Sequence, residues 1–170
     1  MNCCLRCGGD LLQHDQTKHT CTSCRFEQFN NPRAAVALLL FTKDNQLILT
    51  RRAHEPAKGK LDPIGGFLDF GDDFETALWR ELQEETNLTA ADITKLVYAG
   101  SAFNVYHWHG EDEPIAAAYF TATLTTEKSL EPADDVAAFV TYEFDAIPYQ
   151  EIAWSEPAEL IKSIVASRSA

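Results

Sequence analysis

The sequence has few basic residues and no long apolar run. Lysine and arginine together number 14 against 26 aspartates and glutamates, which gives a formal net charge of −12 at pH 7. Nucleic-acid binding needs positive charge, so this balance argues against a nucleic-acid polymer as the main partner. No apolar run reaches the roughly 18 residues that suggest a membrane helix, so no membrane segment is expected. No basic stretch followed by an apolar one marks a secretory signal, and the predicted location is the cytoplasm.

Cysteine is absent after position 24, and four of the five cysteines form two C-x-x-C pairs. The first pair is Cys4 and Cys7, and the second is Cys21 and Cys24. This spacing is typical of a zinc ribbon in which both pairs hold one tetrahedral Zn²⁺. Disulfides are the alternative, and they need an oxidising compartment. Cys3 is left over, either free or in the place of Cys4.

The first 31 residues form a segment too short to bury a useful core, so bound metal is expected to supply its folding energy. Its basic and acidic residues balance, so it lacks the charge of a nucleic-acid module and is expected to be a structural clamp or an oligomer contact. A turn-like stretch at residues 29–32 separates it from the rest. We therefore predict a zinc ribbon at residues 1–31 and a second domain at residues 32–170.

The second domain reads as a mixture of strands and two helices. The first helix is predicted over about residues 73–86, with Asp72 as its N-cap and Glu75 completing a capping box. The last helix is predicted to open at Ser155 as a cap. Apolar and alternating stretches predict strands, the first two as a hairpin, over residues 34–42, 46–51, 95–108, 115–124 and 136–144. This order predicts the α/β class.

The first of these helices carries an unusual acidic face. Glu81, Glu84 and Glu85 are spaced i, i+3 and i+4, which places three carboxylates together on a helix. Like charges so placed repel each other unless a cation lies between them, and oxygen-rich clusters suit Mg²⁺ or Mn²⁺. A solvated acidic surface is the alternative. Gly65 and Gly66 precede the helix and allow a close approach of the backbone.

This segment resembles the Nudix box of the Nudix hydrolases. Asp72 and Asn87 depart from that pattern, which has Glu and Gly there. The positions that match at the right spacing are Gly66, Arg80, Glu81, Leu82, Glu84, Glu85 and Leu88.

The resemblance implies a fold, a reaction and a ligand set. The fold is an α/β/α sandwich with a mixed sheet, and the reaction is Mg²⁺- or Mn²⁺-dependent hydrolysis of a nucleoside diphosphate linked to another group, releasing a nucleoside monophosphate. Glu81, Glu84 and Glu85 would hold the metal with the Gly66 carbonyl, and Arg80 would orient them. A homodimer is also implied. The general base is one of these glutamates or a later carboxylate, namely Glu111, Glu113, Asp134, Asp135 or Glu143.

The substrate is less readable from the sequence. Arg51 and Arg52 are candidates to grip a small phosphorylated nucleotide, and Tyr106 is a candidate to stack on its base. A zinc ribbon before a Nudix box is the layout of NADH pyrophosphatases, but their Ser-Gln-Pro-Trp-Pro-Phe-Pro motif is absent. Dinucleotides and ADP-sugars therefore both remain open. A non-catalytic nucleotide sensor that uses the ribbon as a partner contact is the alternative function.

Overall fold

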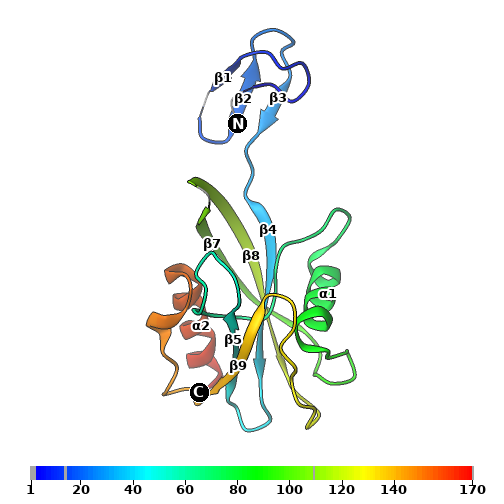
Figure 1. The fold of residues 1–170 in the computed structure, drawn as a ribbon, viewed down its shortest axis with the longest axis vertical. Coiled ribbons are helices and arrows are strands. Elements are labelled where there is room, and N and C mark those ends of the chain that lie inside the picture. Colours follow the sequence, from blue (N-terminus) through cyan, green and yellow to red (C-terminus); the bar gives the residue numbers. More distant parts are fainter. Residues whose placement is uncertain (1–2, 14, 109, 170) are drawn as a thin grey trace. The chain divides into compact units, whose positions relative to one another are not determined.

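The chain folds into two compact units, Met1–Pro32 and Arg33–Ala170 (Figure 1). The computed structural model describes residues 3–13, 15–108 and 110–169. The first unit is a three-stranded antiparallel sheet in the order β1-β2-β3. Its strands are β1 (Leu11–Gln13), β2 (Lys18–Cys21) and β3 (Glu27–Phe29).

The second unit is built on a six-stranded mixed sheet in the order β6-β5-β4-β8-β7, with β9 also pairing with β5. The central strands β4 and β8 run parallel, and the remaining paired strands are antiparallel. The predicted hairpin is confirmed, because β4 and β5 pair directly along the sequence. The strands are β4 (Arg33–Phe41), β5 (Leu47–Arg52), β6 (Leu61–Asp62), β7 (Val97–Trp108), β8 (Glu111–Thr123) and β9 (Val136–Tyr142).

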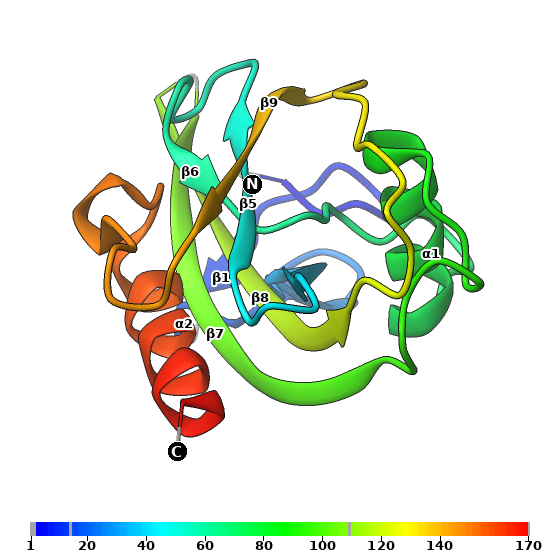
Figure 2. The same cartoon turned by 90° about the horizontal axis from the view of Figure 1, so that it is seen from below.

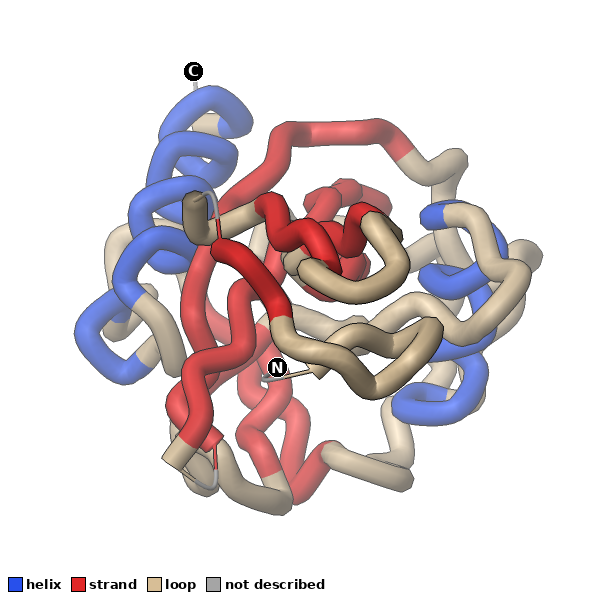
Figure 3. The backbone as a smooth tube through the Cα atoms, turned by 90° about the horizontal axis from the view of Figure 1, so that it is seen from above, coloured by secondary structure: helices blue, strands red, loops and turns tan. Residues whose placement is uncertain are grey.

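Two helices cover opposite faces of this sheet (Figure 2). They are α1 (Phe74–Thr86) and α2 (Ser155–Arg168), with a short 3₁₀ turn, η1 (Tyr149–Glu151), before α2. The view from the other end shows the same order of helix, strands and helix (Figure 3). The predicted α/β/α arrangement with a mixed sheet is therefore confirmed.

Strand β4 supplies both cores because its side chains alternate between the faces. Leu39 and Phe41 belong to the buried cluster that includes Ile161 of α2. Leu38 and Leu40 belong to the cluster that includes α1 side chains. Burial on both faces explains why this segment is a continuous apolar run in the sequence.

The predicted helix caps need two corrections. Asp73, and not Asp72, is the N-cap of α1, and its carboxylate accepts a hydrogen bond from the Thr76 N–H at 2.7 Å. Ser155 is the first residue of α2 and not its cap; its hydroxyl bonds to Glu156, and Trp154 takes the N-cap position without a side-chain bond. At α1 two neighbouring aspartates can take the cap position, and at α2 the helix begins one residue earlier than a Ser155 cap requires; sequence alone does not fix a helix end to one residue.

Two further local features bear on the site. The C-cap of α1 is Asn87 with φ of 57°, which is the left-handed conformation expected of a residue that ends a helix. The short strand β6 lies outside the strands predicted from the sequence, and it pairs with the end of β5. This pairing brings the chain to Gly65 and Gly66 directly beside β4.

Candidate metal and substrate sites

The three glutamates of α1 share one face but differ in exposure. Glu81 and Glu85 are only 8% and 5% exposed, whereas Glu84 is half exposed. Leu78 and Leu82 lie on the same buried side of the helix as Glu81 and Glu85, and they pack into the core beside them. Two of the three predicted metal ligands are thus drawn into the protein, and the third faces solvent.

The glycine loop lies wedged between β4 and α1. The Gly65 N–H donates to Glu85 Oε2 at 3.0 Å, and Gly65 has φ of +140°. The Gly66 carbonyl accepts from the Val36 N–H at 2.9 Å and retains a second lone pair for a cation. A Cβ at Gly66 would lie 2.6 Å from Glu81 Oε1. A side chain at this position would therefore displace the Glu81 carboxylate from the loop.

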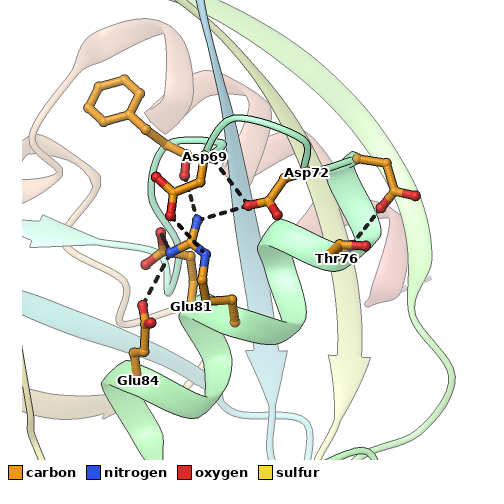
Figure 4. Close-up of polar contacts among 8 residues, drawn as sticks. Asp69, Asp72, Thr76, Glu81 and Glu84 are labelled. Atoms are coloured by element: carbon orange, nitrogen blue, oxygen red, sulfur yellow. Dashed lines mark hydrogen bonds and ion pairs between the residues drawn. The ribbon is translucent and has the colours of Figure 1, made fainter.

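Arg80 bonds to the carboxylates of the acidic face, of which Glu81 and Glu84 are labelled in Figure 4 together with Asp72. Its Nη1 donates to Glu81 Oε1 at 2.8 Å and to Glu84 Oε2 at 3.1 Å. Its Nη2 donates to the Phe67 carbonyl at 2.8 Å and to Asp72 Oδ2 at 3.3 Å. Asp72 thus serves the arginine and not the helix N-terminus. The guanidinium fixes two carboxylates and also ties α1 to the loop before it.

The electrostatics of this cluster favour a cation. Burial is the largest cause that raises the pKa of Glu85, to about 9, and burial also raises the pKa of Glu81 despite its bond to Arg80. Carboxylates crowded in this way are stabilised by a positive charge between them. Two buried carboxylates, one exposed carboxylate and a backbone carbonyl form an all-oxygen donor set, which fits Mg²⁺ or Mn²⁺.

The acidic face opens into a cavity of about 370 Å³. One part of its wall belongs to α1 and the loop before it, with Arg80, Glu81 and Glu84. The other part belongs to the sheet face beneath α2, where three small side chains leave room. These alanines, which we call the alanine floor, are Ala35, Ala37 and Ala117.

The structure separates the two arginines predicted to bind substrate. Arg52 lines the cavity, where its Nη1 donates to Asp62 at 2.8 Å and its Nε to the Pro56 carbonyl at 2.8 Å. Arg51 does not line it; its guanidinium bonds to the Gly59 carbonyl and pairs with Glu151 at 3.1 Å. Adjacent residues on a strand point to opposite faces, which explains the separation.

The predicted stacking residue Tyr106 also lines the cavity, and it is part of an aromatic wall. Its ring stacks on Trp154 with centroids 4.2 Å apart and planes 6° from parallel. The Arg52 guanidinium lies over the Trp154 ring at 5.1 Å, and the Arg33 guanidinium lies over Phe67 at 3.8 Å. Sequence reasoning missed Trp154 and Phe67, because each comes from a loop whose place beside β7 depends on the whole sheet.

The candidate general bases fall into two groups. Asp134 and Asp135 line the cavity. The other three do not line it. Glu113 pairs with Arg33 at 3.5 Å, Glu143 accepts a hydrogen bond from Gln46 at 2.6 Å, and Glu111 is exposed at the start of β8.

The four predicted zinc ligands come together in the first unit. Their sulfur atoms lie within 4.8 Å of one another; Cys4 and Cys24 are 3.8 Å apart, and Cys7 and Cys21 are 3.5 Å apart. Four Zn–S bonds of about 2.3 Å in a tetrahedron need sulfur separations of about 3.8 Å, so the cluster fits Zn²⁺. Cys3 is exposed and lies outside the cluster.

The two cysteine turns repeat the same backbone geometry. In each, the first cysteine of the pair donates its N–H to the carbonyl five residues later and accepts at its own carbonyl from the N–H four residues later. That fourth residue, Gly8 in one turn and Arg25 in the other, has positive φ. Two matching turns facing one another present four sulfurs to a common centre.

The comparisons with known proteins identify the family. The NUDIX domain matches residues 31–164, and the chain belongs to this family. The chain is 30% identical over 102 residues to the NAD-capped RNA hydrolase NudC of Vibrio atlanticus, covering 59% of this chain and 36% of that protein. It is 36% identical over 64 residues to the ADP-ribose pyrophosphatase of Methanocaldococcus jannaschii, covering 38% and 37%. The matches thus span little more than a third of either relative.

Solved structures share the fold. A NUDIX hydrolase from Nitrosomonas europaea superposes with a TM-score of 0.69 at 21% identity, covering 99% of this chain and 93% of that one. A C. elegans Ap4A hydrolase in a binary complex gives 0.67 at 20% identity, covering 81% and 98%. The family resemblance read from the acidic helix is confirmed. Within the described part of the chain, none of the helices has the length and apolar character that crossing a membrane requires.

Proposed function

We propose that this chain is a cytoplasmic hydrolase that uses Mg²⁺ or Mn²⁺ to cleave the pyrophosphate bond of a nucleoside diphosphate linked to another group, releasing a nucleoside monophosphate. The observation that carries the proposal is the acidic face of α1, on which Glu81 and Glu84 are held by Arg80 and line the cavity. A metal-free sensor has no need of such a face, so hydrolysis is favoured over the sensor function.

The proposed role of each residue follows from where it lies in the site. Glu81, Glu84, Glu85 and the Gly66 carbonyl hold the divalent cation, which when bound neutralises phosphate charge and lowers the pKa of a bound water. Arg80 keeps the carboxylates in place. The proton of the attacking water passes to a carboxylate of the cavity, and Asp134 and Asp135 are the candidates from the later loop.

The substrate side of the cavity suits a small nucleotide. Arg52 offers positive charge beside the aromatic wall of Tyr106 and Trp154, and a net charge of −12 disfavours a nucleic-acid polymer. One relative is named for NAD-capped RNA and the other for ADP-ribose, which supports a dinucleotide or an ADP-sugar here. Arg51 is not included among the substrate contacts, because it does not line the cavity.

The remaining parts of the proposal concern assembly. Residues 1–31 form a zinc ribbon in which Cys4, Cys7, Cys21 and Cys24 hold one structural Zn²⁺, and residues 32–170 form the hydrolase domain. A homodimer is proposed on the family resemblance alone. Sedimentation of the zinc-loaded protein measures the mass of the assembly, and a monomer at all concentrations contradicts the dimer.

Substitution of one glutamate tests the metal site. We expect Glu84→Gln to lower turnover about 100-fold or more, because even outer-shell partners of metal ligands cost about 10–100-fold. Turnover is measured as metal-dependent release of nucleoside monophosphate from NADH, NAD⁺, ADP-ribose, ADP-sugars and dinucleoside polyphosphates.

A matched control lies on the same helix. Glu75 is an exposed residue of the first turn of α1 and does not line the cavity, so Glu75→Gln should retain wild-type turnover. Circular dichroism confirms that both variants are folded. Full activity of Glu84→Gln would contradict the metal site, and silence of the folded wild type on every substrate would favour the sensor.

A further inference from the structure

The positive charges that line the cavity differ in how far they are offset. Among the described residues, these cations are Arg33, Arg52 and Arg80. Arg80 donates to two carboxylates of the acidic face. Arg52, with a side chain only 18% exposed, is paired at 2.8 Å with Asp62, a carboxylate that itself lines the cavity. Both of these guanidinium groups therefore have a close carboxylate partner within the site.

Arg33 is held much less closely. It is the first residue of β4, and its guanidinium lies over the Phe67 ring at 3.8 Å. Its carboxylate partner is Glu113 of β8, which does not line the cavity. The distance between Arg33 Nη1 and Glu113 Oε2 is 3.5 Å, longer than the roughly 2.7–2.9 Å of a close charge-assisted bond. Both side chains are about half exposed, so the pair is weak and an anion in the cavity can replace Glu113.

The position of Arg33 points to the phosphate end of a ligand. Phe67, on which its guanidinium rests, directly follows Gly66, whose carbonyl is a proposed metal ligand. The Phe67 carbonyl also accepts from Arg80 Nη2 at 2.8 Å. Arg33 is thus attached to the loop that leads into the acidic helix, and a diphosphate held by metal on that helix lies beside the same loop.

Aromatic rings connect Arg33 to the rest of the cavity wall. The Phe67 ring meets Tyr106 edge-on, with centroids 5.9 Å apart. Tyr106 stacks in turn on Trp154, over which Arg52 lies. A row of three rings therefore has a guanidinium at each end, and contact with a ring restrains each of them. The wall is formed before any ligand arrives, which lowers the entropic cost of binding.

We infer that Arg33 pairs with a phosphate of the substrate's diphosphate, and that Glu113 competes with this phosphate for the guanidinium. The inference rests on the proposed function, because it assigns an anion contact of the same nucleotide. A planar guanidinium presents paired donors that match phosphate oxygens. Arg33 is accordingly a substrate-binding residue that lies far in sequence from the acidic helix, and Glu113 adjusts the affinity through it.

Binding of ADP and adenosine tests the assignment, because these ligands differ only in the diphosphate. Both are titrated by calorimetry against zinc-loaded protein without added Mg²⁺ or Mn²⁺. We expect Arg33→Met to weaken ADP binding about tenfold or more, which is the size of a lost hydrogen bond between charged groups. Glu113→Gln should strengthen ADP binding by up to about fivefold, which is the range of exposed ion pairs. The affinity for adenosine should be the same in all of these proteins.

Combined and conservative substitutions show whether Glu113 acts through Arg33. In the Arg33→Met background, Glu113→Gln should lose most of its gain in ADP affinity. Arg33→Lys keeps the charge but not the paired donors, so its ADP affinity should lie between those of the wild type and Arg33→Met. Added salt should weaken ADP binding more steeply in the wild type than in Arg33→Met, because the variant has one ion pair fewer to screen.

A matched pair outside the cavity is the control. Arg51 and Glu151 are 3.1 Å apart and partly exposed, as Arg33 and Glu113 are, but neither of them lines the cavity. Arg51→Met and Glu151→Gln should therefore keep the wild-type affinity for ADP, and circular dichroism confirms that every variant is folded. A loss of ADP affinity in Arg51→Met as large as that in Arg33→Met reports a general effect of net charge and overturns the inference.

The remaining outcomes separate this inference from the proposed function. A wild type that does not distinguish ADP from adenosine overturns the inference, and so does an Arg33→Met variant with wild-type affinity for ADP. Equal losses of ADP and adenosine affinity overturn it as well, because Arg33 then only supports the aromatic row. An inactive wild type that still shows the expected ADP pattern contradicts only the hydrolase proposal. An active wild type whose Arg33→Met variant keeps the same KM for ADP-ribose contradicts the role of Arg33.

Discussion

Single residues decide how the acidic helix begins and how its carboxylates are held. Asp72 and Asp73 are neighbours with the same side chain, yet one contacts Arg80 and the other caps α1. The division follows from the geometry of the helix end. The N-cap carboxylate accepts from the N–H of Thr76, three residues later, and the residue before the cap is then free to face the arginine. Two adjacent aspartates therefore perform separate tasks at one helix end.

The cap gives a prediction about pH. The Thr76 N–H lowers the pKa of Asp73 below its ordinary value of 3.8. The stabilisation is therefore fully present above pH 3.8 and is lost as the pH falls through the lower, folded-state pKa. We expect Asp73→Ala to lower the Tm by a few degrees at pH 7, and this difference to shrink in acid.

Thermal unfolding followed from pH 7 to pH 3 measures the effect. Asp44→Ala, which removes an exposed carboxylate in the turn before β5, serves as the control and should leave the Tm close to that of the wild type. A Tm difference for Asp73→Ala that stays constant across the whole pH range would contradict the assignment of the cap.

At the scale of elements, β4 connects the core to the site. Its Val36 and Leu38 N–H groups donate to the Gly66 and Ile64 carbonyls at 2.9 and 2.7 Å, so the glycine loop lies along the strand as a short extension of the sheet. The Gly66 carbonyl, proposed as a metal ligand, is thereby fixed to the most buried strand of the unit. The precision of the site depends on this attachment.

Substitution in the loop tests this dependence. A Cβ on Gly65 would lie 2.2 Å from the Val36 carbonyl oxygen, and its φ of +140° is unfavourable for any other residue. We expect Gly65→Ala to lower the free energy of unfolding by about 3 kcal/mol or more in urea titrations. Gly59→Ala has positive φ but open space around it, and should cost only about 1–2 kcal/mol. Equal losses in the two variants would contradict the close approach.

Much of this arrangement could be predicted from the sequence, but pairings between segments that are distant in the chain could not. The β4 and β5 segments, α1 and its glutamates follow from local periodicity and spacing. The parallel pairing of β4 with β8 and the contact of β5 with β9 join distant segments, and no local pattern specifies them. The cavity residues Asn104 and Trp154 depend on those pairings. One feature of the sequence could have pointed to Asn104: it is a polar residue between Ala102 and Tyr106 on the core-facing side of a strand.

At the scale of the whole molecule, the two units depend on different sources of stability. The second unit has two apolar clusters, one on each face of its sheet. In the described part of the first unit, the buried apolar side chains are Cys4 and Cys21. Burial of this size cannot offset the entropy of ordering about 30 residues, which supports the proposal that bound metal supplies the difference.

Removal of one zinc ligand should therefore affect the units unequally. We expect Cys21→Ser to lose its equivalent of Zn²⁺ and to become sensitive to protease within the first 32 residues. The second unit should keep its thermal transition and at least part of its activity. Metal analysis and limited proteolysis measure these outcomes, and Cys3→Ser is the control. Retention of zinc by Cys21→Ser, or its loss from Cys3→Ser, would contradict the assigned ligands.

The alanine floor bears on how such a protein diverges during evolution. Ala35, Ala37 and Ala117 belong to the sheet, whereas the carboxylates belong to α1 on its other face. Replacing one alanine by a bulkier apolar residue narrows the cavity and leaves the acidic helix unchanged. Under the proposed function, nucleotide specificity can change by small steps in strands β4 and β8 while the acidic helix is inherited intact.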